Sequence, residues 1–361
     1  MPDTLTSGGQ IPGGDPLLAG LLGSQPPRID EAAASRLLAE HFGIDATARE
    51  VACERDQNFH AVATDGRGYA LKIANPQEER LITSFQTEAL LWLERTDPGL
   101  PVPKMVPALD GRHEITQILP DGRESVVRVI TWLEGTPLYK AGLTPETERN
   151  IGRVLARIGA ALRDFHHPGE GNDLLWDIRH APRLRPLLSA LPEGELGRAV
   201  RAELDHYAAS VLPEIGHLRR QVVHNDLNHH NVMVCPDAPS TISGVIDFGD
   251  MVNTYLAVDV AVAASYLADR AEETLAPVAR MIGAYHAVTP LFPEEIAVMR
   301  DLIVARLVTS IVITGWRAKR YPENAAYILR NNGPARRAME RFATLDRAAV
   351  TAALMRACDM E

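Results

Sequence analysis

One stretch of the sequence, residues 222–250, restricts the possible folds of this chain more than any other. It reads VVHNDLNHHNVMVCPDAPSTISGVIDFGD, in which short apolar runs alternate with polar turns. That pattern predicts short β-strands joined by loops. Asp226 and Asn231 lie in the polar loop after the first run, and Asp247 ends the last run. We therefore expect two carboxylates and one amide to project from a β-loop-β unit toward one point.

These side chains suit phosphoryl transfer, which needs a carboxylate beside the attacking hydroxyl and metal ions that neutralise the phosphates. Asp226 is predicted to accept or orient the hydroxyl proton. Mg²⁺ prefers oxygen ligands, so Asn231 and Asp247 are its predicted ligands. The alternative is a solvated hairpin with ordinary polar turns. The ordered pattern H-x-D-x-x-x-x-N and then I-D-F-G is much more specific than D-F-G alone.

A lysine on an upstream strand adds to this set. Strands are predicted at 51–53, 59–64 and 69–73, and the turn Asp65-Gly66-Arg67-Gly68 joins the last two. Lys72 lies on the third strand, in Y-A-L-K-I, and is predicted to contact the α- and β-phosphates of a nucleotide. Glu88, on a helix predicted over 77–95, is predicted to form the ion pair that aims Lys72. The alternatives are a surface lysine and a solvated glutamate.

The stretches VVHNDLNHHNVMV and GVIDFGD resemble the aminoglycoside phosphotransferase and choline kinase group, which shares the protein-kinase-like fold. Three further stretches, ERDQNF, LKIANP and IDFGDMVNTYLAVDVAVAASY, are more similar to the hydroxylysine kinases of that group. The resemblance runs from about residue 29 onward. It implies an α+β, two-lobed protein-kinase-like fold, with a small antiparallel-sheet lobe and a larger, mostly helical lobe.

The resemblance also implies roles for other segments. Residues 131–135 are expected to form the hinge, where backbone groups of Thr131 and Leu133 hold the nucleotide base. The segment ERDQN lies where protein kinases have a glycine-rich loop, but it contains no glycine. Gln57 and Asn58, with backbone amides, are predicted to cover the phosphates there; the alternative is an ordinary polar turn. Asp259 corresponds to a buried Asp that braces the catalytic loop.

The chain is expected to divide into a mobile tail over 1–28, a small lobe over 29–133 and a large lobe over 134–361. The nucleotide is expected in the cleft between the lobes. Helices of the large lobe are predicted from residue 144 and at 196–212, 256–268, 271–287, 294–317, 323–331 and 334–358.

Acceptor contacts are predicted at Asn228 and Asp250, beside the catalytic loop, and at Arg317. Core or surface packing explains Arg317 equally well. His224 is expected to brace the loop by hydrogen bonds rather than act as a base. The adjacent His229 and His230, with no cysteine pair, do not predict a zinc site.

Composition narrows the function classes. A formal net charge of −10 argues against non-specific nucleic-acid binding and suits a cationic substrate. Three widely spaced cysteines without a C-x-x-C pattern favour a reducing cytoplasm. No apolar run is long enough to span a bilayer, and no secretory signal is recognisable at the N-terminus.

The sequence therefore predicts a Mg²⁺-dependent kinase that transfers the γ-phosphate of ATP or GTP to a hydroxyl of a small amine-bearing molecule. The resemblance gives 5-hydroxylysine as the first acceptor. Homoserine, choline, ethanolamine or an aminoglycoside are alternatives, as is a non-catalytic pseudokinase-like binding module. The choice between ATP and GTP and the oligomeric state remain open.

Overall fold

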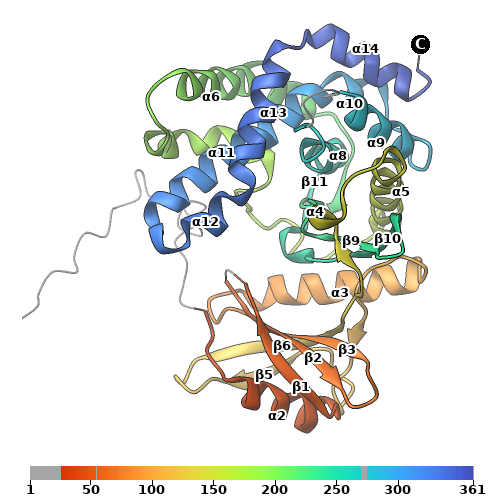
Figure 1. Ribbon diagram of the computed structural model, residues 1–361, viewed down its shortest axis with the longest axis vertical. Helices are drawn as coiled ribbons and strands as arrows, with labels where there is room; N and C mark the ends of the chain where they lie inside the picture. The colour runs from red at the N-terminus through yellow and green to blue at the C-terminus, as the bar shows by residue number, and fades with distance from the viewer. Residues whose placement is uncertain (1–25, 54, 270–274, 361) are drawn as a thin grey trace, which may run out of the picture.

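The computed structural model describes residues 26–53, 55–269 and 275–360, and most of the tail predicted over 1–28 lies outside these ranges. The described chain forms two lobes, a β-rich one and a larger helical one (Figure 1). No helix in the described ranges is long and apolar enough to cross a membrane.

The small lobe is built on an antiparallel sheet in the order β1-β2-β3-β6-β4, with β5 also paired to β6. Its strands are β1 (Ala46–Val51), β2 (Gln57–Ala63), β3 (Gly68–Ile73), β4 (Met105–Val106), β5 (Ile115–Ile118) and β6 (Glu124–Thr131). The predicted first strand at 51–53 is wrong, because the chain leaves the sheet after Val51. The pairing of β1 with β2 runs back to Ala46, and Ala48 is buried there.

Helix α2 (Glu31–Phe42) packs on the outer face of this sheet. Asp30 caps its N-terminus, since the carboxylate accepts a hydrogen bond of 2.7 Å from the Ala33 amide. Gly43 ends the helix at φ 66°, a left-handed conformation that glycine adopts without strain. Leu38 and Phe42 of α2 share a buried cluster with Phe59 of β2.

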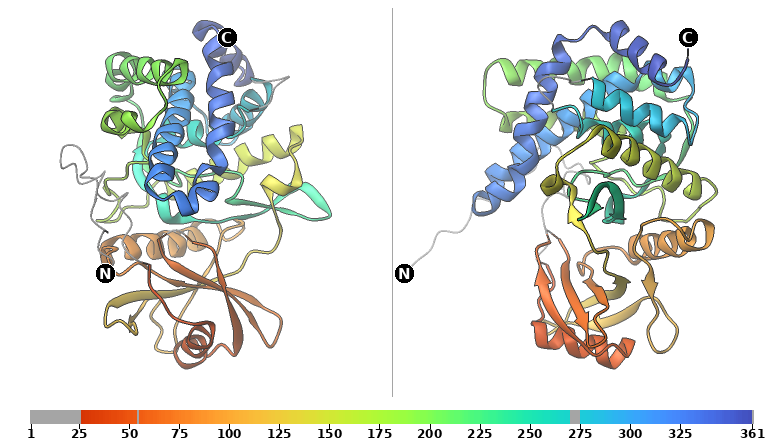
Figure 2. Two further views of the ribbon diagram at one scale, coloured as in Figure 1. Left: turned by 60° about the vertical axis from the view of Figure 1, so that its left-hand side comes forward. Right: turned by 45° about the vertical axis from the view of Figure 1, so that its right-hand side comes forward.

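Helix α3 (Arg80–Thr96) lies between the sheet and the large lobe (Figures 1 and 2). Its apolar residues Phe85, Leu90 and Leu93 belong to the buried cluster of the large lobe, separate from the cluster of the sheet and α2. Trp92 reinforces this attachment, because its indole N–H donates to the Ala161 carbonyl at 2.8 Å. The helix was predicted from residue 77, but it begins only at Arg80.

The large lobe is mostly helical. Its helices are α4 (Leu138–Ala141), α5 (Pro145–Leu162), α6 (Glu195–His206), α7 (Leu212–Ile215), α8 (Leu256–Ser265), α9 (Ala276–His286), α10 (Pro293–Ala297), α11 (Met299–Arg320), α12 (Ala325–Ile328), α13 (Asn332–Thr344) and α14 (Arg347–Ala357). Helices α8 and α11 lie in its core, and every residue of α8 is buried.

Two predicted helices of this lobe are divided. The pattern over 294–317 forms α10 and α11, and the pattern over 334–358 forms α13 and α14. Asp346 starts α14, because its carboxylate accepts a hydrogen bond of 2.8 Å from the Ala349 amide. The apolar period continues across both breaks, which is why the sequence did not reveal them.

Two small sheets hold the stretch 222–250. Strand β8 (Arg220–Val223) pairs with β11 (Val252–Tyr255), whereas β9 (Val232–Cys235) pairs with β10 (Ala238–Val245) and β7 (Thr136–Pro137). The predicted strands are present, but the loop from β8 to β9 passes between two different sheets. The loop is therefore held at both ends.

Candidate active site

The loop after β8 is fixed from behind. Asn225 has a left-handed backbone, with φ 62°, and its amide donates to the Asp259 carboxylate at 2.7 Å. Burial raises the pKa of Asp259 to about 7, although backbone N–H donors oppose the shift. Asp259 thus braces the catalytic loop, in the position that the resemblance implied.

His224 supports the same loop. Its fully buried ring accepts the Asp226 amide at Nδ1, 3.3 Å away, and its Nε2 lies 3.2 Å from the Ile246 carbonyl. The ring also packs edge-on against Phe248, at 4.7 Å between centroids. Burial lowers the pKa of His224 to about 4, so the imidazole is neutral near pH 7. His224 therefore joins the start of the loop to the segment that carries Asp247.

The Asp226 carboxylate receives three hydrogen bonds. Its Oδ2 accepts from the side-chain amides of Asn228, at 2.8 Å, and Asn231, at 2.9 Å. Its Oδ1 accepts from Nη2 of Arg306, at 2.7 Å. Burial raises the pKa of Asp226 to about 6, and the adjacent guanidinium opposes that shift. The structure thus brings together three residues predicted from the sequence and one that was not.

Arg306 lies on α11, 80 residues from Asp226 in the sequence, and is only 2% exposed. It also donates to the Tyr266 hydroxyl at 3.0 Å and to the Trp176 carbonyl at 3.1 Å. The sequence held one signal that we did not use, namely a cation in the middle of the apolar run LIVARLVTSIVI. This part of the helix is buried on all sides, so a cationic side chain within it requires an anionic or hydrogen-bonding partner.

The two predicted metal ligands lie on adjoining segments. The Asn231 carbonyl accepts from the Ile246 amide at 2.9 Å, which places Asn231 beside the residue before Asp247. The side-chain nitrogen of Asn231 is occupied by Asp226, so the amide oxygen is left as the ligand atom. Asp247 is exposed, and its Oδ1 contacts the Gly249 amide at 3.3 Å. An amide oxygen and a carboxylate are hard ligands that fit Mg²⁺.

Asp250 follows on the turn Phe248–Asp250. Burial raises the pKa of Asp250 to about 8, and the negative charges of Asp226 and Asp247 add to this effect. Three acidic side chains therefore interact around this end of the cleft, which favours a cation there.

The face of the small-lobe sheet that points away from α2 carries a row of polar side chains. Asn58, Lys72 and Arg128 are direct partners on β2, β3 and β6, so they point to the same face of the sheet. Lys72 forms no ion pair or hydrogen bond with the residues that the structure describes. Two cations thus lie side by side at the place where nucleotide phosphates are predicted.

The predicted Lys72–Glu88 ion pair does not form. Glu88 is exposed on α3, one position beyond Thr87, and therefore points away from the sheet. Arg128 reaches α3 instead, with hydrogen bonds to the Thr83 carbonyl at 3.1 Å and to Oε1 of Gln86 at 2.8 Å. The prediction relied on spacing along the chain, which does not fix the rotation of a helix.

The side chain of Gln57 points away from the predicted phosphate position. Its side chain is 2% exposed, and its amide group exchanges two hydrogen bonds of 2.9 Å with the backbone of Ile29. Alternation along β2 turns Gln57 to the face of α2 and Asn58 to the opposite face. Gln57 therefore ties the start of the described chain to the sheet, and only Asn58 keeps its predicted position.

Some backbone groups of the segment between the lobes could bind a nucleotide base, because other groups of this segment already form hydrogen bonds within the protein. The Thr131 amide donates to the Lys104 carbonyl at 2.9 Å and the Trp132 amide to the Gly68 carbonyl at 3.0 Å. The Thr131 carbonyl and the Leu133 backbone therefore remain as candidates. Trp132 stacks on His60, with ring centroids 3.9 Å apart, and closes the sheet face at this end.

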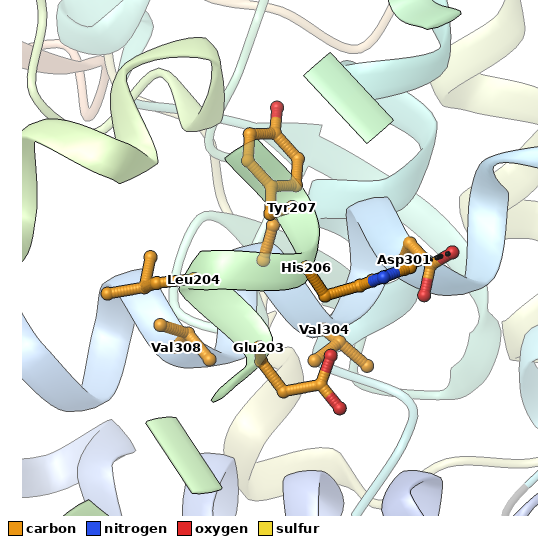
Figure 3. Close-up of a pocket in the computed structure, with 8 residues that line it drawn as sticks. Glu203, Leu204, His206, Tyr207, Asp301, Val304 and Val308 are labelled. Carbon is orange, nitrogen blue, oxygen red and sulfur yellow. Dashed lines mark ion pairs between the residues drawn. The ribbon is translucent and has the colours of Figure 1, made fainter. Parts of the chain in front are cut away.

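Arg317, predicted to contact the acceptor, and a hollow in the large lobe both lie apart from Asp226. Arg317 is 11 residues beyond Arg306 on α11, about 16 Å along the helix axis, so it is not brought against Asp226. A narrow hollow between α6 and α11, where Nε2 of His206 lies 3.4 Å from a carboxylate oxygen of Asp301, is lined by none of the predicted site residues (Figure 3).

Comparison with known proteins was consistent with this geometry. A model of the phosphotransferase enzyme family matches residues 47–302. The chain belongs to this family. Its relatives include hydroxylysine kinase of Bos taurus, 26% identical over 326 residues, which cover 84% of this chain and 86% of the relative. Hydroxylysine kinase of Xenopus laevis is 27% identical over 331 residues, 85% of this chain and 88% of the relative.

Solved structures of other kinases have a similar fold. An amicoumacin kinase, in complex with AMP-PNP, Ca²⁺ and Ami, superposes with a TM-score of 0.67 at 16% identity, over 89% of this chain and 97% of that one. A microcompartment-associated aminopropanol kinase gives 0.63 at 20% identity, over 87% and 98%. The predicted two-lobed, protein-kinase-like α+β fold is confirmed.

Proposed function

We propose that this protein is a Mg²⁺-dependent kinase that transfers the γ-phosphate of ATP or GTP to a hydroxyl of a small amine-bearing metabolite, with 5-hydroxylysine as the first candidate. The observation that carries the proposal is the arrangement around Asp226. A carboxylate held by three hydrogen bonds lies beside an amide and a carboxylate suited to Mg²⁺, and the small lobe carries Lys72 next to Arg128.

In this mechanism, Asp226 accepts a hydrogen bond from the acceptor hydroxyl and aligns its oxygen with the γ-phosphorus. Asn231 and Asp247 hold Mg²⁺, which when bound neutralises the phosphate charge. Lys72 and Asn58 contact the phosphates. The Thr131 carbonyl and the Leu133 backbone hold the base.

An amine-bearing acceptor is supported by charge. Asp250 interacts electrostatically with the carboxylates of Asp226 and Asp247, and the whole chain carries a net charge of −10. A protonated amine is attracted to such a site, so Asp250 and Asn228 are the proposed acceptor contacts. The relatives named hydroxylysine kinase give 5-hydroxylysine priority over homoserine, choline, ethanolamine and an aminoglycoside. The cytoplasmic setting remains a prediction.

The test is phosphate transfer by the purified protein with Mg²⁺, in which ATP and GTP are crossed with 5-hydroxylysine, homoserine, choline, ethanolamine and kanamycin. We expect the highest kcat/KM with 5-hydroxylysine, and the two nucleotide series give the base preference. A higher value with another acceptor would replace 5-hydroxylysine and keep the reaction. Nucleotide binding without transfer to any acceptor would favour the pseudokinase-like binding module.

A further inference from the structure

Arg306 makes a contact that the proposed reaction does not by itself require. We infer that Arg306 is a positioning residue, which fixes the Asp226 carboxylate in the orientation that receives the acceptor hydroxyl. This inference rests on the proposed function and assigns part of it to a helix far from the catalytic loop in sequence.

The contacts of Arg306 leave its guanidinium little freedom. It is 2% exposed and donates to three oxygens on three segments, those of Asp226, Tyr266 and the Trp176 carbonyl. The guanidinium also lies 5.1 Å from the centre of the Trp176 ring and 5.8 Å from that of Tyr266. A planar cation held in this way is a rigid reference for its carboxylate partner.

The hydrogen bonds define which acceptor position remains. An ionised carboxylate has about four lone-pair positions, two on each oxygen. Asn228 and Asn231 occupy both positions of Oδ2, and Arg306 occupies one of Oδ1. The fourth position, on the oxygen that Arg306 binds, is left for the acceptor hydroxyl. Loss of Arg306 would free Oδ1 to turn, and misplacement by about 1 Å lowers turnover about 100-fold.

A purely structural ion pair makes the opposite prediction. Removing one partner of a buried ion pair leaves an uncompensated charge and destabilises the fold, so a purely structural Arg306 would influence stability rather than turnover. Arg300 on the same helix provides a matched control. It is 4% exposed and binds Asp301 at 2.7 Å, but neither residue touches Asp226.

The first experiment compares Arg306→Met, Arg306→Lys and Arg300→Met in the full chain, with ATP, Mg²⁺ and the preferred acceptor. We expect Arg306→Met to lower kcat about 100-fold, while the KM for ATP stays within about twofold of the wild-type value. Arg306→Lys keeps the charge and recovers part of the loss. Arg300→Met keeps kcat within about twofold. Equal kcat values for Arg306→Met and Arg300→Met would overturn the inference.

A second experiment requires no activity. In the wild-type background Asp226→Asn is expected to lower the melting temperature, because it weakens the contact with Arg306. In the Arg306→Met background the same change is expected to raise it, because it removes an unpaired buried carboxylate. If wild type transfers no phosphate, the proposed function fails, but this sign reversal still decides whether the pair is coupled. A shift of the same sign in both backgrounds would contradict the inference.

Discussion

Each lobe buries an arginine beside its site residues, and the two side chains have different partners. Arg306 in the large lobe binds the Asp226 carboxylate at 2.7 Å. Arg128 in the small lobe is 4% exposed and donates to neutral oxygens of α3, with no acid in ion-pair contact among the residues described. Burial lowers the pKa of the Arg128 guanidinium below its ordinary range.

The different partners of Arg306 and Arg128 indicate which charged ligands each lobe requires. The large lobe holds acids whose charge is partly balanced internally, so it needs only a metal and a cationic acceptor. The small lobe places Lys72 directly opposite Arg128, and like charges in that position destabilise a sheet. An anion such as a nucleotide phosphate relieves this repulsion. The Asp226 carboxylate thus has an internal cationic partner, whereas Arg128, among the residues described, has only the more distant acids Asp56, Glu78 and Glu114. We expect nucleotide phosphate to stabilise the small lobe further.

The largest effect is expected where the large lobe is broken at its metal site. Asp247→Ala removes a carboxylate ligand, so we expect turnover to fall about 1,000-fold, equivalent to about 4 kcal/mol, with a weaker dependence on Mg²⁺. The measurement is kcat against Mg²⁺ concentration. Asp237→Ala, the same change at an exposed residue between β9 and β10, is the control. An unchanged Mg²⁺ dependence would exclude Asp247 as a ligand.

A second test uses the buried imidazole of the large lobe. The pKa of His224 is lowered from about 6.5 to about 4, so the unfolded state binds a proton that the folded state does not. Its contribution to stability is present above pH 6.5 and is lost as the pH falls toward 4, by about 3 kcal/mol.

Urea unfolding at several pH values between 4 and 7 measures this loss. His224→Gln should flatten the dependence, whatever its effect at pH 7. His229, whose pKa burial also lowers to about 4, contributes in the same direction, so His229→Gln tests it separately. A slope unchanged in His224→Gln would show that the folded protein protonates this ring.

A smaller effect is expected at the strained residue before Asp226. Asn225 has φ 62°, where glycine is comfortable and most other residues are not. We expect Asn225→Ala to lower the free energy of unfolding by about 1 kcal/mol more than Asn225→Gly does. Chemical denaturation of the two variants measures the difference. Equal values would mean that the large lobe stores no strain at this position.

The smallest effect tests the like-charge repulsion in the small lobe. Without nucleotide, Lys72→Met should raise the free energy of unfolding by about 0.5 kcal/mol, because it removes a cation opposite Arg128. With ATP and Mg²⁺, wild type should gain more stability than the variant. Lys319→Met, at an exposed position near the end of α11, is the control. A destabilised Lys72→Met without nucleotide would contradict the comparison.

The sequence predicted the parts of the site that depend on local pattern. Asp226, Asn231 and Asp247 follow short apolar runs, and strand endings fix where such residues lie. Asn58 and Lys72 follow from the two-residue period of strands, and the same period shows that Gln57 has to face the other way. That error arose because the phase of β2 was not applied to its first residue.

What the sequence did not predict depends on tertiary contact. Arg306 meets Asp226 across 80 residues, and only the packing of α11 in the core brings them together. The predicted Lys72–Glu88 ion pair was wrong for the same reason. The rotation of α3 about its axis is set by its packing on the large lobe, not by the number of residues between Lys72 and Glu88. Both residues show that a charge on a helix is assigned safely only after the buried face of the helix is known.

The division of the buried core has a consequence for the opening of the cleft. The buried apolar residues Phe85, Leu90 and Leu93 of α3 belong to the cluster of the large lobe, whereas most of those of the sheet belong with α2; Met105 of β4 is an exception. We therefore expect any relative motion of the lobes to occur between the sheet and α3, which are joined by polar contacts such as the hydrogen bonds of Arg128. We expect the sheet and α2 to move together over a stationary α3. Such a motion exposes little apolar surface, so nucleotide exchange should proceed with a small change in heat capacity.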